Sequence, residues 1–152
     1  MDEKRQPESP SAMITALYDR PGFLLRRCVQ ETGFAFEQGC AELGLTARQY
    51  DFLFALQDGD PMDQDQLARI LGLDRSTTGT VLRILERKKL VAREVSGVDR
   101  RKRSVILTTA GDEIFHAAES AALASRARAL NPLEPEERQI FLSMLRRIVE
   151  GE

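Results

Sequence analysis

The sequence predicts a mainly α-helical fold with a small β-wing, in which a winged helix-turn-helix lobe lies between N- and C-terminal helices. Three observations lead to this prediction. Apolar residues recur at helical spacing over most of the chain. Between Asp63 and Thr108, two short helical patterns flank a turn and precede two β-type runs. Basic residues are concentrated in the same stretch of the chain.

The composition bounds the class of protein. The chain has 152 residues, which fits one domain, and its 30% charged content is typical of a charged, mostly helical protein. No stretch approaches the ~18 apolar residues that a membrane span requires. Residues 1–11 are acidic and proline-bearing, without the apolar core of a signal peptide. We therefore expect a disordered N-terminal tail over residues 1–20 and a cytoplasmic protein.

Two helices are expected after the tail. Pro21 suits the first turn of a helix, because its missing N–H has no helical acceptor there. Two apolar stripes then run to about Leu43 and give a face wider than one neighbouring helix would cover. The next helix is expected from about Thr46 to Gln57, with Thr46 as its N-cap and the turn residues 58–61 after it.

The following two helical patterns form the helix-turn-helix. Asp63 is a plausible N-cap of the first helix, Gly72 suits a left-handed residue at its end, and Asp74 caps the second helix. The inner stripe of the second helix is apolar. Its outer face carries polar side chains at spacings of four, three and four: Ser76, Thr80, Arg83 and Arg87. Such a face suits a recognition helix in a DNA groove.

Two β-type runs, Leu90–Val95 and Ser104–Leu107, flank a basic loop over residues 96–102 and predict the wing. Between Asp74 and Arg103 the sequence holds ten basic and four acidic residues, a net charge of +6. The whole chain carries −2, so the remaining residues carry −8. This concentration of positive charge indicates nucleic-acid binding.

Two more helices are expected after the wing. Thr109 and Asp112 stand at capping-box spacing and predict the start of a long helix over about residues 110–129. A last helix is expected from near Pro135, and its apolar stripe is too extensive for an isolated surface helix. The stripe therefore indicates a packing partner for this helix.

The run Asp65–Thr77 resembles the helix-turn-helix of the MarR family of transcription regulators. Asp99 to Arg101, followed by Val105–Gly111, resembles that family's wing and its Leu-Thr-x-Ala-Gly exit. The resemblance extends from Pro21 to Val149 and covers the order of the helices. The segments that look most like members controlling aromatic-acid breakdown are Pro21–Arg27 and Leu73–Gly79.

The resemblance implies a homodimeric winged-helix transcription regulator, usually a repressor, that binds a near-palindromic operator in double-stranded DNA. It implies a domain over residues 21–152, with the winged helix-turn-helix lobe at about 46–109. Dimerisation helices would span about 21–43 and 110–150, with a ligand crevice between them and the lobe.

Two positions depart from the family pattern. The family usually has glycine where this chain has Lys89, and a left-handed conformation there would cost a non-glycine residue about 1 kcal/mol. Either the recognition helix ends differently or Lys89 adds a phosphate contact. Many members carry arginine where this chain has Thr80, so base reading is expected to differ.

Candidate DNA contacts lie on the recognition helix and the wing. Helix N-termini favour phosphates, and Arg83 could pair bidentately with guanine. An arginine at the wing tip would suit a narrow minor groove, and the resemblance implies that Asp99 orients it. The candidate DNA-binding residues are Arg75, Ser76, Thr77, Thr80, Arg83, Arg87, Lys88, Lys89, Arg100, Arg101, Lys102 and Arg103.

The expected effector is an aromatic carboxylate or its thioester, which needs a cation and an apolar slot. Arg26 or Arg27, with Tyr50 and Phe54, could supply them from neighbouring helices. In the alternative interpretation, Tyr50 and Phe54 belong to the core and the two arginines are exposed to solvent.

Two other functions stay open. The same fold could be a redox-switched repressor acting through Cys28 or Cys40, although a cysteine in the apolar stripe of the first helix is expected to be buried and inert. A winged helix can also serve as a protein-interaction module. Neither the cysteine spacing nor the single histidine, His116, indicates a metal site, and no catalytic motif is present. We expect neither an enzyme nor a bound cofactor.

Overall fold

The computed structural model describes residues 12–95 and 103–151, and these form seven α-helices, one 3₁₀ turn and three short strands. In chain order the elements are α1 (Ala12–Tyr18), α2 (Pro21–Gly39), the 3₁₀ turn η1 (Ala41–Leu43), α3 (Ala47–Ala55), β1 (Met62–Asp63), α4 (Gln64–Ile70), α5 (Arg75–Arg87), β2 (Val91–Val95), β3 (Arg103–Leu107), α6 (Thr109–Leu130) and α7 (Pro135–Glu150).

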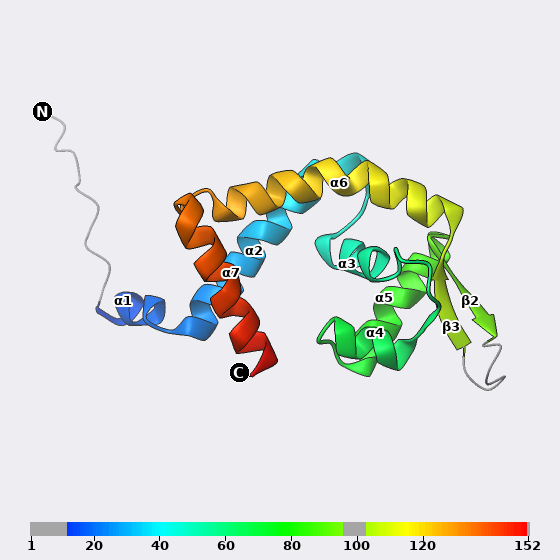
Figure 1. Ribbon diagram of the computed structural model, residues 1–152, viewed down its shortest axis with the longest axis horizontal. Coiled ribbons are helices and arrows are strands. Elements are labelled where there is room, and N and C mark those ends of the chain that lie inside the picture. The colour runs from blue at the N-terminus through cyan, green and yellow to red at the C-terminus, as the bar shows by residue number, and fades with distance from the viewer. Residues whose placement is uncertain (1–11, 96–102, 152) are drawn as a thin grey trace, which may run out of the picture.

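The long helices α2 and α6 pack against each other and form an arm, and the lobe made of α3 to β3 hangs from one end of it (Figure 1). At the crossing, a Cβ on Gly39 would lie 2.8 Å from the Cβ of Ala121, so only glycine permits this approach. Farther along, the Ser125 hydroxyl donates a 2.7 Å hydrogen bond to the carbonyl of Thr32. The predicted mainly α-helical fold is confirmed.

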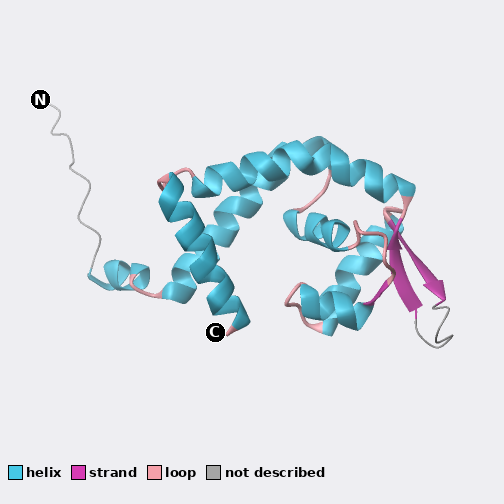
Figure 2. Cartoon of the chain, viewed as in Figure 1, coloured by secondary structure: helices cyan, strands magenta, loops and turns pink. Residues whose placement is uncertain are grey.

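The wing is a three-stranded antiparallel sheet in the order β1-β3-β2, drawn in magenta in Figure 2. Val91 pairs with Leu107, and Met62 pairs with Val105. The short strand β1 therefore joins the wing to the start of α4. This confirms the two predicted wing strands and adds a third strand that the sequence pattern did not reveal.

Local capping places the helices of the lobe. Thr46, Asp63 and Asp74 cap α3, α4 and α5, because each side chain accepts a hydrogen bond from the backbone N–H three residues later. Gly72 has φ 62°, the left-handed conformation predicted for the turn between α4 and α5. These four predictions are confirmed.

The predicted cap of the long helix after the wing is wrong by one residue. Thr108, not Thr109, accepts the 3.0 Å hydrogen bond from the N–H of Gly111. The Thr108 N–H also donates to the carbonyl of Leu90, which fixes this residue at the junction with β2. Asp112 instead accepts a 2.8 Å hydrogen bond from the amide of Gln57 in the lobe.

The prediction of a disordered tail over residues 1–20 is wrong for Ala12–Tyr18, which form α1. The Tyr18 ring packs edge-on against Phe23 at 5.3 Å, so α1 has an apolar partner on α2. Residues 1–11 lie outside the described part of the chain.

The core lies inside the lobe and continues into the arm. Its fully buried side chains come mainly from α3, α4, α5 and β3, with Cys40 just after α2 and Ala118 from α6, and it also includes Phe36 of α2 and Phe115 of α6. In contrast, α7 buries no residue, and its apolar side chains Ile140 and Met144 are more than half exposed. No helix in the described ranges has the length and apolar content needed to cross a membrane.

Candidate DNA-binding surface and ligand cavity

Helix α5 has the two faces that its sequence predicted. Thr78, Val81, Leu82 and Leu85 are buried against the lobe. The four polar residues of the outer face, Ser76, Thr80, Arg83 and Arg87, are all exposed. A row of hydrogen-bonding side chains is therefore available on the outside of the helix.

Thr80 and Arg83 form one unit on this face. The guanidinium of Arg83 donates a 2.9 Å hydrogen bond to the Thr80 hydroxyl, which donates in turn to the carbonyl of Ser76 at 3.0 Å. Thr80 thus gives the Arg83 guanidinium a hydrogen-bond acceptor on the outer face of the helix.

The first turn of α5 is tightly organised by Asp74. Its carboxylate accepts hydrogen bonds from the Thr77 hydroxyl at 2.6 Å and from the Thr77 N–H at 2.8 Å. These bonds hold the pKa of Asp74 below its usual value, the side-chain bond contributing most. Arg75 lies 3.5 Å from Asp65 in an exposed ion pair with α4.

A shallow hollow of about 490 Å³ lies beside this turn, between α4, α5 and β2. Two of its lining residues, Gln64 and Arg93, were not among the predicted site residues. Gln64 donates a 3.0 Å hydrogen bond to the carbonyl of Arg75. Arg93 forms a half-buried ion pair with Glu86 at 2.5 Å, which ties the wing to α5. Neither contact has a local sequence pattern that could have predicted it.

The two lysines after α5 differ. The Lys88 ammonium donates to the carbonyl of Gly44 and to the side-chain oxygen of Gln49, so it points back toward the start of α3. Lys89 has φ 60° and is the non-glycine residue with positive φ among the described residues. The recognition helix therefore ends in the left-handed conformation that the family's glycine would adopt, and it does not end differently.

The predicted contacts at the tip of the wing lie outside the described residues. These are Asp99, Arg100, Arg101 and Lys102, together with the side chain of Arg103. Their roles at the DNA stay predictions.

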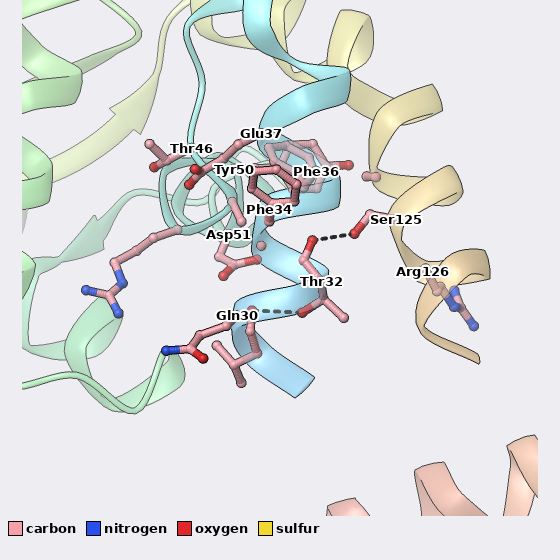
Figure 3. A pocket seen from close by; sticks show the side chains of 15 residues that line it. Gln30, Thr32, Phe34, Phe36, Glu37, Thr46, Tyr50, Asp51, Ser125 and Arg126 are labelled. Atoms are coloured by element: carbon pink, nitrogen blue, oxygen red, sulfur yellow. Dashed lines mark hydrogen bonds between the residues drawn. The ribbon is translucent and has the colours of Figure 1, made fainter. Parts of the chain in front are cut away.

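A cavity of about 910 Å³ lies where α2 and α6 of the arm meet α3 of the lobe (Figure 3). Its aromatic side is built on Tyr50, whose ring lies 5.1 Å from Phe36 and stacks on Phe115 at 5.0 Å. The lining residues are Val29, Gln30, Thr32, Gly33, Phe34, Phe36, Glu37, Thr46, Ala47, Arg48, Tyr50, Asp51, Ala122, Ser125 and Arg126.

The cavity wall carries charges of both signs. Arg48 and Arg126 are its cations, and Glu37 and Asp51 are its carboxylates. Desolvation raises the pKa of Asp51, and the charge of Arg48 partly opposes that shift. Burial also raises the pKa of the Tyr50 hydroxyl, so Tyr50 stays a neutral hydrogen-bond donor.

The structure brings only two of the predicted effector residues together, because the Tyr50 and Phe54 rings lie 6.3 Å apart whereas the two arginines lie elsewhere. Tyr50 lines the cavity, whereas Phe54 does not and is 63% exposed. Arg26 and Arg27 also lie off its wall; Arg27 pairs with Glu31 at 3.1 Å and lines a separate cavity of about 390 Å³. The cations among the lining residues are Arg48 and Arg126, which the sequence analysis missed.

The two cysteines and the histidine differ in their exposure to solvent. Cys28 is exposed, so the expectation that it is buried is wrong for the single chain. Cys40 is buried, and burial raises the pKa of its thiol. His116 is exposed between Asp112 and Glu119, at 3.4 and 3.2 Å. The described ranges contain no cluster of ligands suited to a metal ion.

The sequence matches known proteins over most of its length. The pattern of the MarR family matches residues 43–102. The transcriptional regulator HosA of Escherichia coli O157:H7 is 30% identical over 105 residues, which cover 69% of this chain and 78% of HosA.

Solved structures of other regulators share the fold of this chain. BpsR of Bordetella bronchiseptica, whose DNA binding is regulated by 6-hydroxynicotinic acid, is 28% identical with a TM-score of 0.81, covering 88% of this chain and 96% of BpsR. The repressor CouR, solved on a 23-mer DNA duplex, is 28% identical with a TM-score of 0.79, covering 90% of this chain and 96% of CouR. The chain belongs to the MarR family and is a winged helix-turn-helix, DNA-binding transcriptional regulator.

Proposed function

We propose that the chain is a homodimeric repressor that binds a near-palindromic operator and is released from it by a small aromatic acid or its thioester. Two relatives support this proposal: CouR is a repressor that binds a DNA duplex, and 6-hydroxynicotinic acid regulates the DNA binding of BpsR.

The dimer is supported by apolar surface that one chain leaves uncovered. Ile140, Met144 and Ile148 follow one stripe of α7 and are each more than half exposed. Val29 on α2 is likewise 69% exposed. A second copy that packs against these helices would bury both surfaces. The two copies of α5 could then enter successive major grooves, which are about 34 Å apart.

The proposed DNA contacts follow from the exposed face of α5. Arg83, oriented by Thr80, reads a base, and Arg75, Ser76, Thr77, Arg87 and Lys89 face the phosphates. The predicted wing contacts are Arg100, Arg101, Lys102 and Arg103, with Asp99 orienting one arginine of the wing.

The position of the 910 Å³ cavity is the observation that carries the effector proposal. One wall belongs to the arm that would hold the dimer together, and another belongs to the DNA-binding lobe. A ring could stack beside Phe36 and Tyr50, with its carboxylate near Arg48 or Arg126. A ligand that fits better when the two lobes are wrongly spaced lowers operator affinity by linkage alone.

The test is an operator-shift assay with a panel of hydroxylated aromatic acids and their thioesters, including 6-hydroxynicotinic acid. We expect one class to weaken DNA binding about 10-fold or more, a typical allosteric coupling. At least one of Arg48→Gln and Arg126→Gln should lose this response and keep operator affinity, whereas Arg27→Gln, off the cavity wall, should keep both. A panel without any effect on the operator complex would refute the effector proposal.

A redox-released repressor is the second candidate, because Cys28 is exposed. The buried Cys40, with its raised pKa, is a poor sensor by comparison. Peroxide should abolish operator binding of the wild-type protein but not of Cys28→Ser if this candidate is correct. Operator binding that resists peroxide would exclude it.

A further inference from the structure

Lys88 joins two parts of the fold that are far apart in the sequence. It is the C-cap residue of α5, and its ammonium lies 2.5 Å from the carbonyl oxygen of Gly44 and 2.9 Å from the side-chain oxygen of Gln49. Gly44 follows η1 in the connection between α2 and α3, and Gln49 lies in the first turn of α3. The contact therefore links the end of the recognition helix to the junction between the arm and the lobe.

Both acceptors are held in place independently of Lys88. Gln49 is only 8% exposed and forms a capping box with Thr46 at the start of α3. Gly44 ends η1 in a left-handed conformation and donates its N–H to the carbonyl of Ala41. Because both acceptors are fixed, the Lys88 side chain forms a defined bridge between α5 and the start of α3; this bridge of Lys88, Gly44 and Gln49 is called the strut below.

Each end of the strut lies at a functional position. Beyond Lys88, the chain turns through Lys89, with φ 60°, into the buried Leu90 and then β2 of the wing. At the other end, Thr46 is both the capping partner of Gln49 and part of the cavity wall. The strut therefore fixes the end of the recognition helix relative to α3 and to the connection that joins the lobe to the arm.

We propose that Lys88 is a positioning residue, which braces α5 against the α2–α3 connection and is not one of the phosphate-contacting cations. An ammonium has three N–H donors, and two of those of Lys88 are already used inside the protein. Arg87 and Lys89, its neighbours, have no such partner in the described part of the chain and remain available to DNA.

This role has its own signature in DNA binding. A residue that neutralises a phosphate releases counterions. Its loss therefore makes the plot of log affinity against log salt less steep, by about 0.9 per contact. A residue that only positions the recognition helix changes affinity but leaves the slope unchanged. The two roles can therefore be separated without knowledge of any effector.

The experiment uses the full chain and a duplex that the wild-type protein selects from a random-sequence pool. Lys88→Met keeps the stem of the side chain and removes its donors. We expect about a 10-fold weaker operator affinity at one salt concentration, the size expected from bonds between a charged donor and neutral acceptors. The salt slope should equal that of the wild type. Arg87→Met is the matched control, and its slope should fall.

The partner of Lys88 provides an independent arm. Gln49→Leu, which removes the acceptor without removing a charge, should reproduce the loss, and the double variant with Lys88→Met should lose little more than either single variant. Gln49→Glu keeps the acceptor and should bind like the wild type. The comparison of Gln49→Leu with Gln49→Glu tests the positioning role of Lys88 even if Lys88→Met fails to fold.

A salt slope for Lys88→Met as low as that of Arg87→Met would show that Lys88 contacts a phosphate and would overturn the inference. Wild-type affinity in Lys88→Met and Gln49→Leu would overturn it as well. The inference depends on DNA binding and not on the proposed ligand, so failure of the effector panel leaves it standing.

Discussion

Gly111 lies in the first turn of α6, and an added methyl group at this position should strongly reduce the free energy of unfolding. A Cβ there would lie 2.0 Å from the carbonyl oxygen of Leu90 and 2.8 Å from the side chain of Leu107. The obstacle at Leu90 is backbone, so it cannot move aside as a flexible side chain can. Gly111→Ala must therefore separate the start of α6 from the junction between α5 and β2.

The magnitude follows from the contacts that this separation breaks. Real Cβ atoms do not approach closer than 3.0 Å, so a retreat of about 1 Å is required. The Thr108 N–H now donates to the Leu90 carbonyl at 3.1 Å, and the Thr108 hydroxyl is shared between the carbonyls of Leu90 at 3.0 Å and Lys89 at 2.8 Å; such a retreat ends both contacts with Leu90. Each costs about 1 kcal/mol, and overpacking adds about 1–3 kcal/mol. The better helix propensity of alanine returns about 1 kcal/mol, leaving a net loss of roughly 2–4 kcal/mol.

Thermal unfolding at one fixed protein concentration checks this value. The melting temperature of Gly111→Ala should fall by about 5–15 °C, given about 2–4 °C per kcal/mol in a domain of this size. Gly33→Ala is the matched control, because a Cβ there meets nothing within 4 Å and the residue lies inside α2. That variant should keep or gain stability. If Gly111→Ala unfolded within about 0.5 kcal/mol of the wild type, the steric argument would be refuted.

Three further predictions rest on single residues. Lys89→Gly should be more stable than Lys89→Ala by about 1 kcal/mol in urea unfolding, because only glycine adopts φ 60° without strain; equal midpoints would contradict this. The lowered pKa of Asp74 means that its carboxylate stabilises the fold above the ordinary aspartate pKa near 4, and that this stability disappears as pH falls through the lowered pKa. The stability advantage of the wild type over Asp74→Asn should accordingly shrink between pH 6 and pH 3, and a constant difference would disprove the linkage. In a thiol titration of the native protein, Cys28 should react at once and Cys40 only after denaturation; two fast thiols would contradict the burial of Cys40.

The helices of the lobe could be predicted from sequence because their determinants are local. Thr46, Asp63 and Asp74 cap helices through the backbone three residues away, and a capping side chain meets its partner within one turn. Thr109 shows the limit of this reasoning. It has the right residue type and spacing, but its neighbour Thr108 is fixed by Leu90, eighteen residues earlier, and takes the capping position.

The ligand cavity could not be predicted in the same way, because its wall comes from three separate helices. The sequence pattern placed Tyr50 on the correct face of α3 but could not identify which arginines lie beside it. Arg48 is two residues before Tyr50, whereas Arg126 comes from α6, which crosses α2 in a register set by Gly39. No pattern within one helix contains that information.

Apolar stripes raise a related difficulty. A stripe predicts that a helix face is covered, but it does not predict whether the cover comes from the same chain or another. Cys28 was expected to be buried because it lies in such a stripe, and it is exposed in the single chain. The apolar stripe on α7 is also exposed, because no other part of the described chain covers it. The exposed stripe on α7 is consistent with a surface reserved for a second copy of the chain.

Two cationic side chains of the basic surface are held by hydrogen bonds within the protein, although positive charge alone would attract DNA without them. Arg83 is held by Thr80, and Lys88 is bonded to the start of α3. Freely rotating cations would give the same net charge, but each would lose side-chain entropy on meeting DNA. In the proposed complex, fixing Arg83 before binding would remove part of that cost for its base contact, whereas Arg87 would need only charge to meet a phosphate. On the proposed contacts, the held Arg83 would supply sequence preference and the free Arg87 general affinity, both from a single helix.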